Sequence, residues 1–174
     1  MIKEQMEKAL NNQIQEEMFS GYLYLAMSAD FAAKNFEGFA TWMYVQALEE
    51  FTHAQRFYNH ILERGGTIEL KELKKPQQSW EKPVDAFAAA YEHEQHITSC
   101  IHKLYKLSRE IDDYESETML QWFIDEQVEE EDNASTILEK LKLIGDNGQG
   151  LLMMDKELGV RMFTPPVGVK FYGV

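Results

Sequence analysis

Apolar residues recur every three or four positions along most of the chain, the spacing that places them on one face of an α-helix. This pattern predicts four long helices and a short fifth one. The expected helices are Lys3–Ala33, a second that follows "KNFEGF" (34–39) and reaches Arg64, Pro83–Arg109, Glu115–Ile144 and Leu151–Leu158. Gly65 and Gly66 suit the end of the second helix, and Pro83 suits the first turn of the third.

The links between these helices predict how they pack. The links after the first and third helices are short, so each should close an antiparallel hairpin. The link from Gly65 to Lys82 is long enough to run the length of a helix of about 42 Å. The second and third helices should then point the same way. We therefore expect an all-α four-helix bundle with one long crossover connection in 1–145, and a short C-terminal fifth helix and an extended tail of the same domain in 146–174.

Composition and charge narrow the possible partners. The 174 residues carry a formal net charge of −13, which argues against nucleic acid and anionic membranes and favours cationic ligands. The single cysteine, Cys100, allows no internal disulfide and suits a reducing compartment. The start "MIKEQMEKAL" lacks the apolar core of a signal peptide, and no long apolar run follows. We expect a cytoplasmic protein.

Each apolar track is interrupted near its centre by residue types that bind metals. The interruptions are Glu17, Glu50, His53, Glu94, Gln127 and Glu130. In an antiparallel hairpin, residues equidistant from the turn face each other. Glu17 and the Glu50–His53 pair are symmetric about the first short link, and the three later residues are symmetric about the second. All six side chains should therefore meet at one level of the core.

Four carboxylates, one imidazole and one amide at one level of a core need compensation, because an ionised carboxylate taken out of water costs several kcal/mol. Protonation is one form of compensation, and two divalent cations are another. Carboxylates with one histidine and no thiolate suit iron or manganese better than copper or a structural zinc site.

With these residues, the sequence resembles the ferritins, and most closely the bacterial non-heme ferritins. Glu17, Glu50-x-x-His53 and Glu94 match the ferritin-like pattern of glutamates and Glu-x-x-His pairs on four helices. Gln127-x-x-Glu130 stands where symmetric di-iron proteins carry a second Glu-x-x-His, a departure that is itself ferritin-like. Thr52 stands where a bacterioferritin would carry a heme-ligating methionine, so we expect no heme.

The resemblance implies a di-iron centre. Glu17, Glu50 and His53 would hold the first iron. The implied ligands of the second are Glu50 as a bridge, Glu94 and Glu130, with Gln127 nearby. Tyr24, on the same helix face as Glu17, would neighbour the pair and donate an electron.

A third iron site is also implied by the resemblance, at Glu49, Glu126 and Glu129. Glu130 falls angularly between Glu126 and Gln127 on the helix, so it could serve either site. A run such as "DEQVEEED" (125–132) is also typical of a solvated helix face. "HEQH" (93–96) is one residue short of a zinc-protease motif, and we expect its two histidines at the surface.

The implied activity is ferroxidation. Fe(II) would be oxidised by O₂ or H₂O₂ and stored as a ferric oxo-hydroxide mineral inside a hollow homo-oligomer, expected to contain 24 copies. One alternative is a di-iron oxidase or peroxidase of the same fold without mineral storage, although the second Glu-x-x-His that such enzymes usually need is missing. Another is a non-catalytic helical assembly protein whose polar core only sets the register of its helices.

Overall fold

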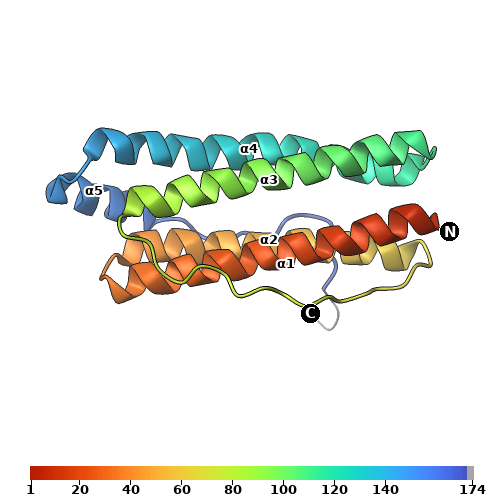
Figure 1. Cartoon of the computed structure of the whole chain (residues 1–174), viewed down its shortest axis with the longest axis horizontal. Coiled ribbons are helices and arrows are strands. Elements are labelled where there is room, and N and C mark those ends of the chain that lie inside the picture. The colour runs from red at the N-terminus through yellow and green to blue at the C-terminus, as the bar shows by residue number, and fades with distance from the viewer. Residues whose placement is uncertain (172–174) are drawn as a thin grey trace.

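A computed structural model describes residues 1–171 and consists of five helices joined by loops (Figure 1). The helices are α1 (Glu4–Ala33), α2 (Glu37–Glu63), α3 (Pro83–Glu110), α4 (Tyr114–Ile144) and α5 (Gly148–Leu158). The all-α prediction is confirmed, and the four long helices lie close to their predicted bounds. The fifth begins at Gly148 rather than Leu151, because the Asn147 side chain accepts a hydrogen bond from the Gly150 amide and caps the helix.

The four long helices form two antiparallel hairpins, α1–α2 and α3–α4 (Figure 1). Each hairpin turns at a residue in the left-handed region, Asn35 with φ of 62° and Asp112 with φ of 50°. Asparagine and aspartate tolerate this conformation better than most residues. The two turn residues are separated by the same interval as Glu17 and Glu94. The hairpins are therefore structural repeats of each other.

The crossover between α2 and α3 runs alongside α1, and α2 and α3 point the same way (Figure 1). Near one end of α1, the Asn11 side chain donates to the Thr67 carbonyl and accepts from the Glu69 amide. Near the other end, Asp30 accepts from the amide of buried Trp80. These side chains satisfy backbone groups that an extended segment leaves without partners. The predicted crossover topology is thus confirmed.

The core consists of two apolar clusters separated by a polar level. The cluster nearer α5 includes Phe31, Phe39 and Phe87, and the other includes Phe57 and Phe123. A fully buried side chain of this size contributes about 1.5–3 kcal/mol. The two clusters hold the bundle together on either side of the carboxylates, so the polar level need not stabilise the fold itself.

The fifth helix packs across the start of α2 at a very close approach. A Cβ on Gly38 would lie 1.6 Å from the Asp155 carbonyl oxygen, so only glycine fits there. The Asp155 side chain accepts a hydrogen bond from the Phe39 amide at 2.9 Å. After α5 the chain folds back along α2 (Figure 1), where the Asn59 side chain donates to the Lys170 carbonyl at 3.0 Å. The described helices include none that is long and apolar enough to span a membrane.

One surface prediction is wrong. His96 is exposed, as expected, but His93 is half-buried between α3 and α1. Its ring lies edge-on to Phe19 and Tyr24, and its Nε2 is 2.7 Å from the Ser20 Oγ. Burial lowers the pKa of His93 to about 4, so its imidazole is neutral. The adjacent apolar face of α1, rather than the local motif, decides this burial.

Candidate metal centre

The structure brings all six core polar residues to one level between the two apolar clusters. None of their side chains is more than 5% exposed. They are Glu17 from α1, Glu50 and His53 from α2, Glu94 from α3, and Gln127 and Glu130 from α4. Each lies on the inward face of its helix because it continues the apolar periodicity of its neighbours.

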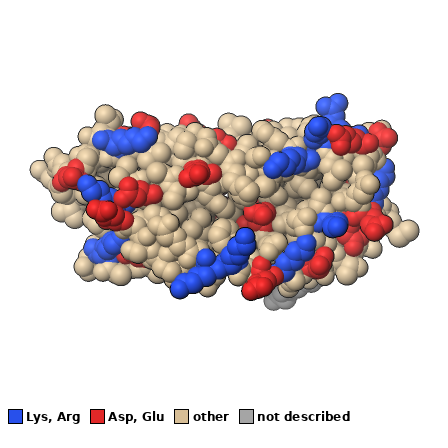
Figure 2. Space-filling view, in the orientation of Figure 1, with Lys and Arg blue, Asp and Glu red and all other residues tan. Residues whose placement is uncertain are grey.

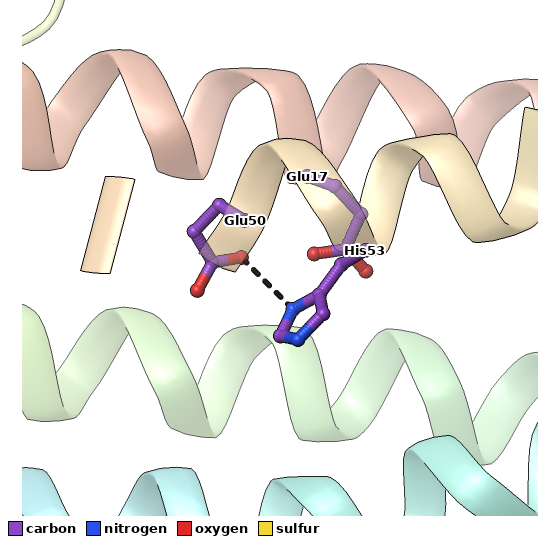
Figure 3. Close-up of side chains that lie close together, drawn as sticks. All are labelled: Glu17, Glu50 and His53. Carbon is purple, nitrogen blue, oxygen red and sulfur yellow. Dashed lines mark ion pairs between the residues drawn. The ribbon is translucent and has the colours of Figure 1, made fainter. Parts of the chain in front are cut away.

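The α1–α2 half of this level forms a compact three-residue group. Glu17, Glu50 and His53 each offer one ligand atom, and these atoms lie within 4.8 Å of one another (Figure 3). The His53 Nδ1 is 3.5 Å from the Glu50 Oε2. The Glu17 Oε1 accepts from the Gln13 side chain at 2.8 Å, whereas its Oε2 is buried and has no hydrogen-bond partner. No hydrogen bond competes with a cation for that second oxygen.

The α3–α4 half is joined by hydrogen bonds. Glu94 accepts one from the Tyr24 hydroxyl and another, at 3.3 Å, from the Gln127 Nε2. Glu130 accepts one at 2.6 Å from the Nε2 of Gln46, a buried residue of α2. The same Nε2 lies 3.2 Å from a Glu50 oxygen. Gln46 therefore links the two halves.

Burial shifts the ionisation of every acid in this group. Loss of hydration raises the pKa of Glu94 to about 7 and, together with the nearby Glu94 carboxylate, that of Glu130 to about 8. Burial also raises the pKa of Glu17 and, with repulsion from Glu94, that of Glu50. Without a cation, the level therefore retains protons near neutral pH.

His53 responds in the opposite sense. Burial alone would lower its pKa, but the carboxylates of Glu126 and Glu50 outweigh burial and raise the pKa well above the ordinary value. The imidazole therefore supplies positive charge while no metal does so. A divalent cation placed among these oxygens would take over that compensation.

The predicted third-site residues are only partly brought together. Glu49 and Glu126 are half-buried and Glu129 is exposed. Glu126 joins His53 and Glu130 in a second compact group, with its Oε1 3.8 Å from the His53 Nε2. Neither of the compact groups found among residues 1–171 contains Glu49 or Glu129. The Glu49 carboxylate instead forms an ion pair with Arg161 of the tail.

Three neighbours of the centre were missed by the sequence analysis. Gln13 and Gln46 donate to its carboxylates, and Arg161 contacts both Gln46 and Glu49. Gln46 could have been found, since it lies on the apolar track of α2 one turn before Glu50. Nothing in the sequence identified Arg161, because a tail without periodicity gives no information about what it contacts.

A four-helix bundle with a buried layer of carboxylates and one histidine is typical of the class of di-metal carboxylate proteins. The donor set fits iron, which binds well to carboxylate oxygens and imidazole. The unpartnered Glu17 oxygen supports the same fit, since a buried polar atom without a partner is costly.

Comparisons with known proteins give the family. A model of the ferritin-like domain matches residues 7–144. The bacterial non-heme ferritin of Staphylococcus aureus is 36% identical over 94% of this chain and 98% of the relative, and that of Campylobacter jejuni is 36% identical over 90% and 93%. The structure of an open-pore ferritin from the archaeon Archaeoglobus fulgidus matches with a TM-score of 0.92 at 42% identity, covering 93% of this chain and 100% of that one. The chain belongs to the ferritin family.

Proposed function

We propose that the buried carboxylate layer is the ferroxidase centre of this ferritin. As a ferritin, the protein stores iron and oxidises Fe(II) to Fe(III). The observation that supports this location is the convergence of four buried carboxylates, one with an unpartnered oxygen, at a single level of the bundle. Such a layer is unfavourable without cations and becomes favourable when they bind.

Two iron positions follow from the arrangement of the side chains. Glu17, Glu50 and His53 would hold the first Fe(II). Glu50 would also face the second position. The carboxylates of Glu50 and Glu130 both accept from the same group, the Gln46 side-chain amide. The ligands proposed for the second Fe(II) are Glu50, Glu94 and Glu130, with Gln127 alongside. The stoichiometry is then two irons per chain.

Protons leave as iron enters. The raised pKa values of Glu94 and Glu130 mean that both acids carry protons for part of the time at neutral pH. Fe(II) binds the carboxylate form, so it displaces these protons.

Each Fe(II) then gives up one electron, and the pair reduces O₂ to H₂O₂ with two protons from water. The same centre accepts H₂O₂ as an oxidant.

Tyr24 is positioned to serve this chemistry. Its hydroxyl donates a hydrogen bond to Glu94, a proposed iron ligand. Burial and the neighbouring carboxylates raise the pKa of Tyr24, so it remains a neutral phenol. We assign Tyr24 the role of an electron donor next to the second iron.

The chain exposes apolar side chains that suit a homo-oligomer. Leu143 and Leu152 are 88% and 64% exposed, and Met153 and Met162 are exposed to a similar degree. Exposed apolar side chains gain free energy when contact with another copy removes them from water. We propose a hollow cage of 24 copies that encloses the mineral. Its location would be the cytoplasm, since the single cysteine suits a reducing compartment.

Charged side chains bear on how Fe(II) reaches the protein. On the face shown in Figure 2, acidic and basic side chains are interspersed, so this face offers Fe(II) no continuous acidic surface.

The acids Glu49, Glu126 and Glu129 lie on α2 and α4, and we propose that they form a third iron site beside the centre. No heme is proposed, since Thr52 provides no methionine sulfur.

Anaerobic addition of Fe(II) followed by O₂ tests the proposal. We expect rapid oxidation of about two irons per chain and then slower uptake of many more. A di-iron oxidase or peroxidase of the same fold would form no mineral. A purely structural bundle would show no saturable oxidation, and either result would overturn the proposed function.

A further inference from the structure

Arg161 lies in the tail just after α5 and is held by three contacts. Its guanidinium lies over the Trp42 ring, with the central carbon 4.5 Å from the ring centroid. It forms an ion pair with Glu49 and donates a hydrogen bond of 2.8 Å to the Gln46 Oε1. Only 21% of its side chain is exposed. These contacts hold a positive charge beside Glu49 and next to Gln46, which in turn contacts the buried centre.

The contact with Gln46 determines how that amide is oriented. Because its oxygen accepts from Arg161, its NH₂ group is directed toward Glu50 and Glu130. The opposite orientation would place the amide oxygen against two carboxylates and the NH₂ group against a guanidinium, which has no acceptor. Arg161 thereby positions a donor that contacts two of the proposed iron ligands.

The contact with Glu49 favours the ionised form of that one carboxylate. Burial raises the pKa of the half-buried Glu49, and repulsion from Glu126 and Glu129 adds to this, whereas Arg161 opposes the shift by stabilising the ionised form. A cation that binds Glu49 must compete for an oxygen that the guanidinium already contacts. One side chain thus contacts Glu49 directly and the buried centre through Gln46.

We propose that Arg161 is a positioning residue that acts as the resident cation of Glu49 and competes with metal for this carboxylate. This inference rests on the proposed function, because it assumes that the outer acids bind iron. Metal binding at Glu49 releases the guanidinium, and Gln46 then loses the partner that orients it toward Glu50 and Glu130. The outer site and the di-iron centre are coupled through this residue.

The test measures metal binding by the assembled protein rather than its activity. Anaerobic calorimetric titration with Fe(II) gives the affinity of each class of site in the wild type and in Arg161→Ala. We expect two tight sites per chain in both proteins, and a third site whose affinity rises about tenfold in the variant, since a half-buried competing charge is gone. Anomalous maps from Zn²⁺-soaked crystals should show a matching rise in occupancy beside Glu49.

Two controls separate charge from tail anchoring. Asn59→Ala removes a hydrogen bond that holds the same tail but removes no charge, so its third site should match the wild type. Arg161→Gln keeps a donor beside Gln46 without the charge and should reproduce the tighter third site. It also provides the test if Arg161→Ala does not assemble.

An unchanged or weaker third site in both Arg161 variants would overturn the inference, as would an equal gain in Asn59→Ala. Failure of the proposed function is recognised separately. In that case the wild type itself lacks the two tight sites, whatever the variants do.

Discussion

The two hairpins present equivalent positions at the same level of the core, but their side chains differ. The equivalent pairs are Glu17 with Glu94, Glu50 with Gln127, and His53 with Glu130. The first pair is the same in both halves, since each residue is a glutamate. At the other two, the α1–α2 hairpin has a carboxylate and an imidazole, where the α3–α4 hairpin has an amide and a carboxylate.

This difference makes the two proposed iron positions unequal. The α1–α2 half supplies a compact group of three ligand atoms, including an unpartnered carboxylate oxygen. In the other half, Gln127 directs its Nε2 at Glu94 and at the Thr98 hydroxyl, both at 3.3 Å, and so acts as a hydrogen-bond donor. We expect the first position to bind iron more tightly and the second to release it more readily.

Removing one ligand from either half should have the largest effect. Glu94→Ala and His53→Ala each delete a group that we assign to one iron, and we expect the fast phase of oxidation to fall by about 100-fold or more. Stopped-flow absorbance of Fe(III) measures this phase. His96→Ala removes an exposed histidine from the same helix as Glu94 and should retain the wild-type rate. Wild-type oxidation by both ligand variants would show that the site is assigned incorrectly.

The stability of the metal-free protein should fall as pH rises. The raised pKa values of Glu94 and Glu130 mean that the folded chain retains protons that the unfolded chain loses above about pH 4.5. The raised pKa of His53 acts in the same direction. Between pH 5 and pH 8 we expect Tm to fall on the order of 5 °C in calorimetry. Added Zn²⁺ should reverse the fall, and a metal-free Tm that rises over this range would contradict the assigned protonation.

Making the halves more alike should strengthen the second position. Gln127→Glu introduces a carboxylate at the position equivalent to Glu50, and we expect Fe(II) to bind there about tenfold more tightly. The fifth buried acid should also lower the Tm of the metal-free variant. Anaerobic titration and calorimetry measure the two effects. Tighter binding without the loss of metal-free stability would mean that the new acid is not buried beside Glu94.

Tyr24→Phe should have the smallest effect. The change removes the hydroxyl that donates to Glu94 while keeping the buried ring. We expect the first oxidation to remain within about threefold of the wild-type rate and the yield of H₂O₂ per iron to change, because an electron source is lost. Tyr22→Phe, an exposed change on the same helix, is the matched control. Identical oxidation and H₂O₂ yields in both variants would remove Tyr24 from the mechanism.

Most of the bundle could be predicted because the apolar periodicity continues through the polar residues. Glu50 and Glu94 lie on tracks whose other members are buried, so their inward direction followed from spacing alone. The start of α5 was harder to predict, because glycines around Asn147 resemble a loop until the Asn147 cap is seen. His93 was predicted wrongly, since its burial depends on residues of α1 that are distant in sequence.

The outer part of the site could not be predicted from spacing. Glu126 reaches His53, whereas Glu49 is held by Arg161. Spacing places each acid next to the inward face of its own helix and does not distinguish these two outcomes. Arg161, the residue that pairs with Glu49, comes from the tail, and the course of the tail depends on the packing of α5 against Gly38. Tyr172, in the part of the chain predicted to form an extended tail, falls outside the described residues.

The most direct test of the central claim is an anomalous-scattering map at the iron edge, from crystals soaked anaerobically in Fe(II). The account predicts two peaks per chain at the level of Glu50, one beside Glu17 and His53 and the other beside Glu94 and Glu130. A map without iron at that level, in crystals that carry iron elsewhere on the chain, would contradict it.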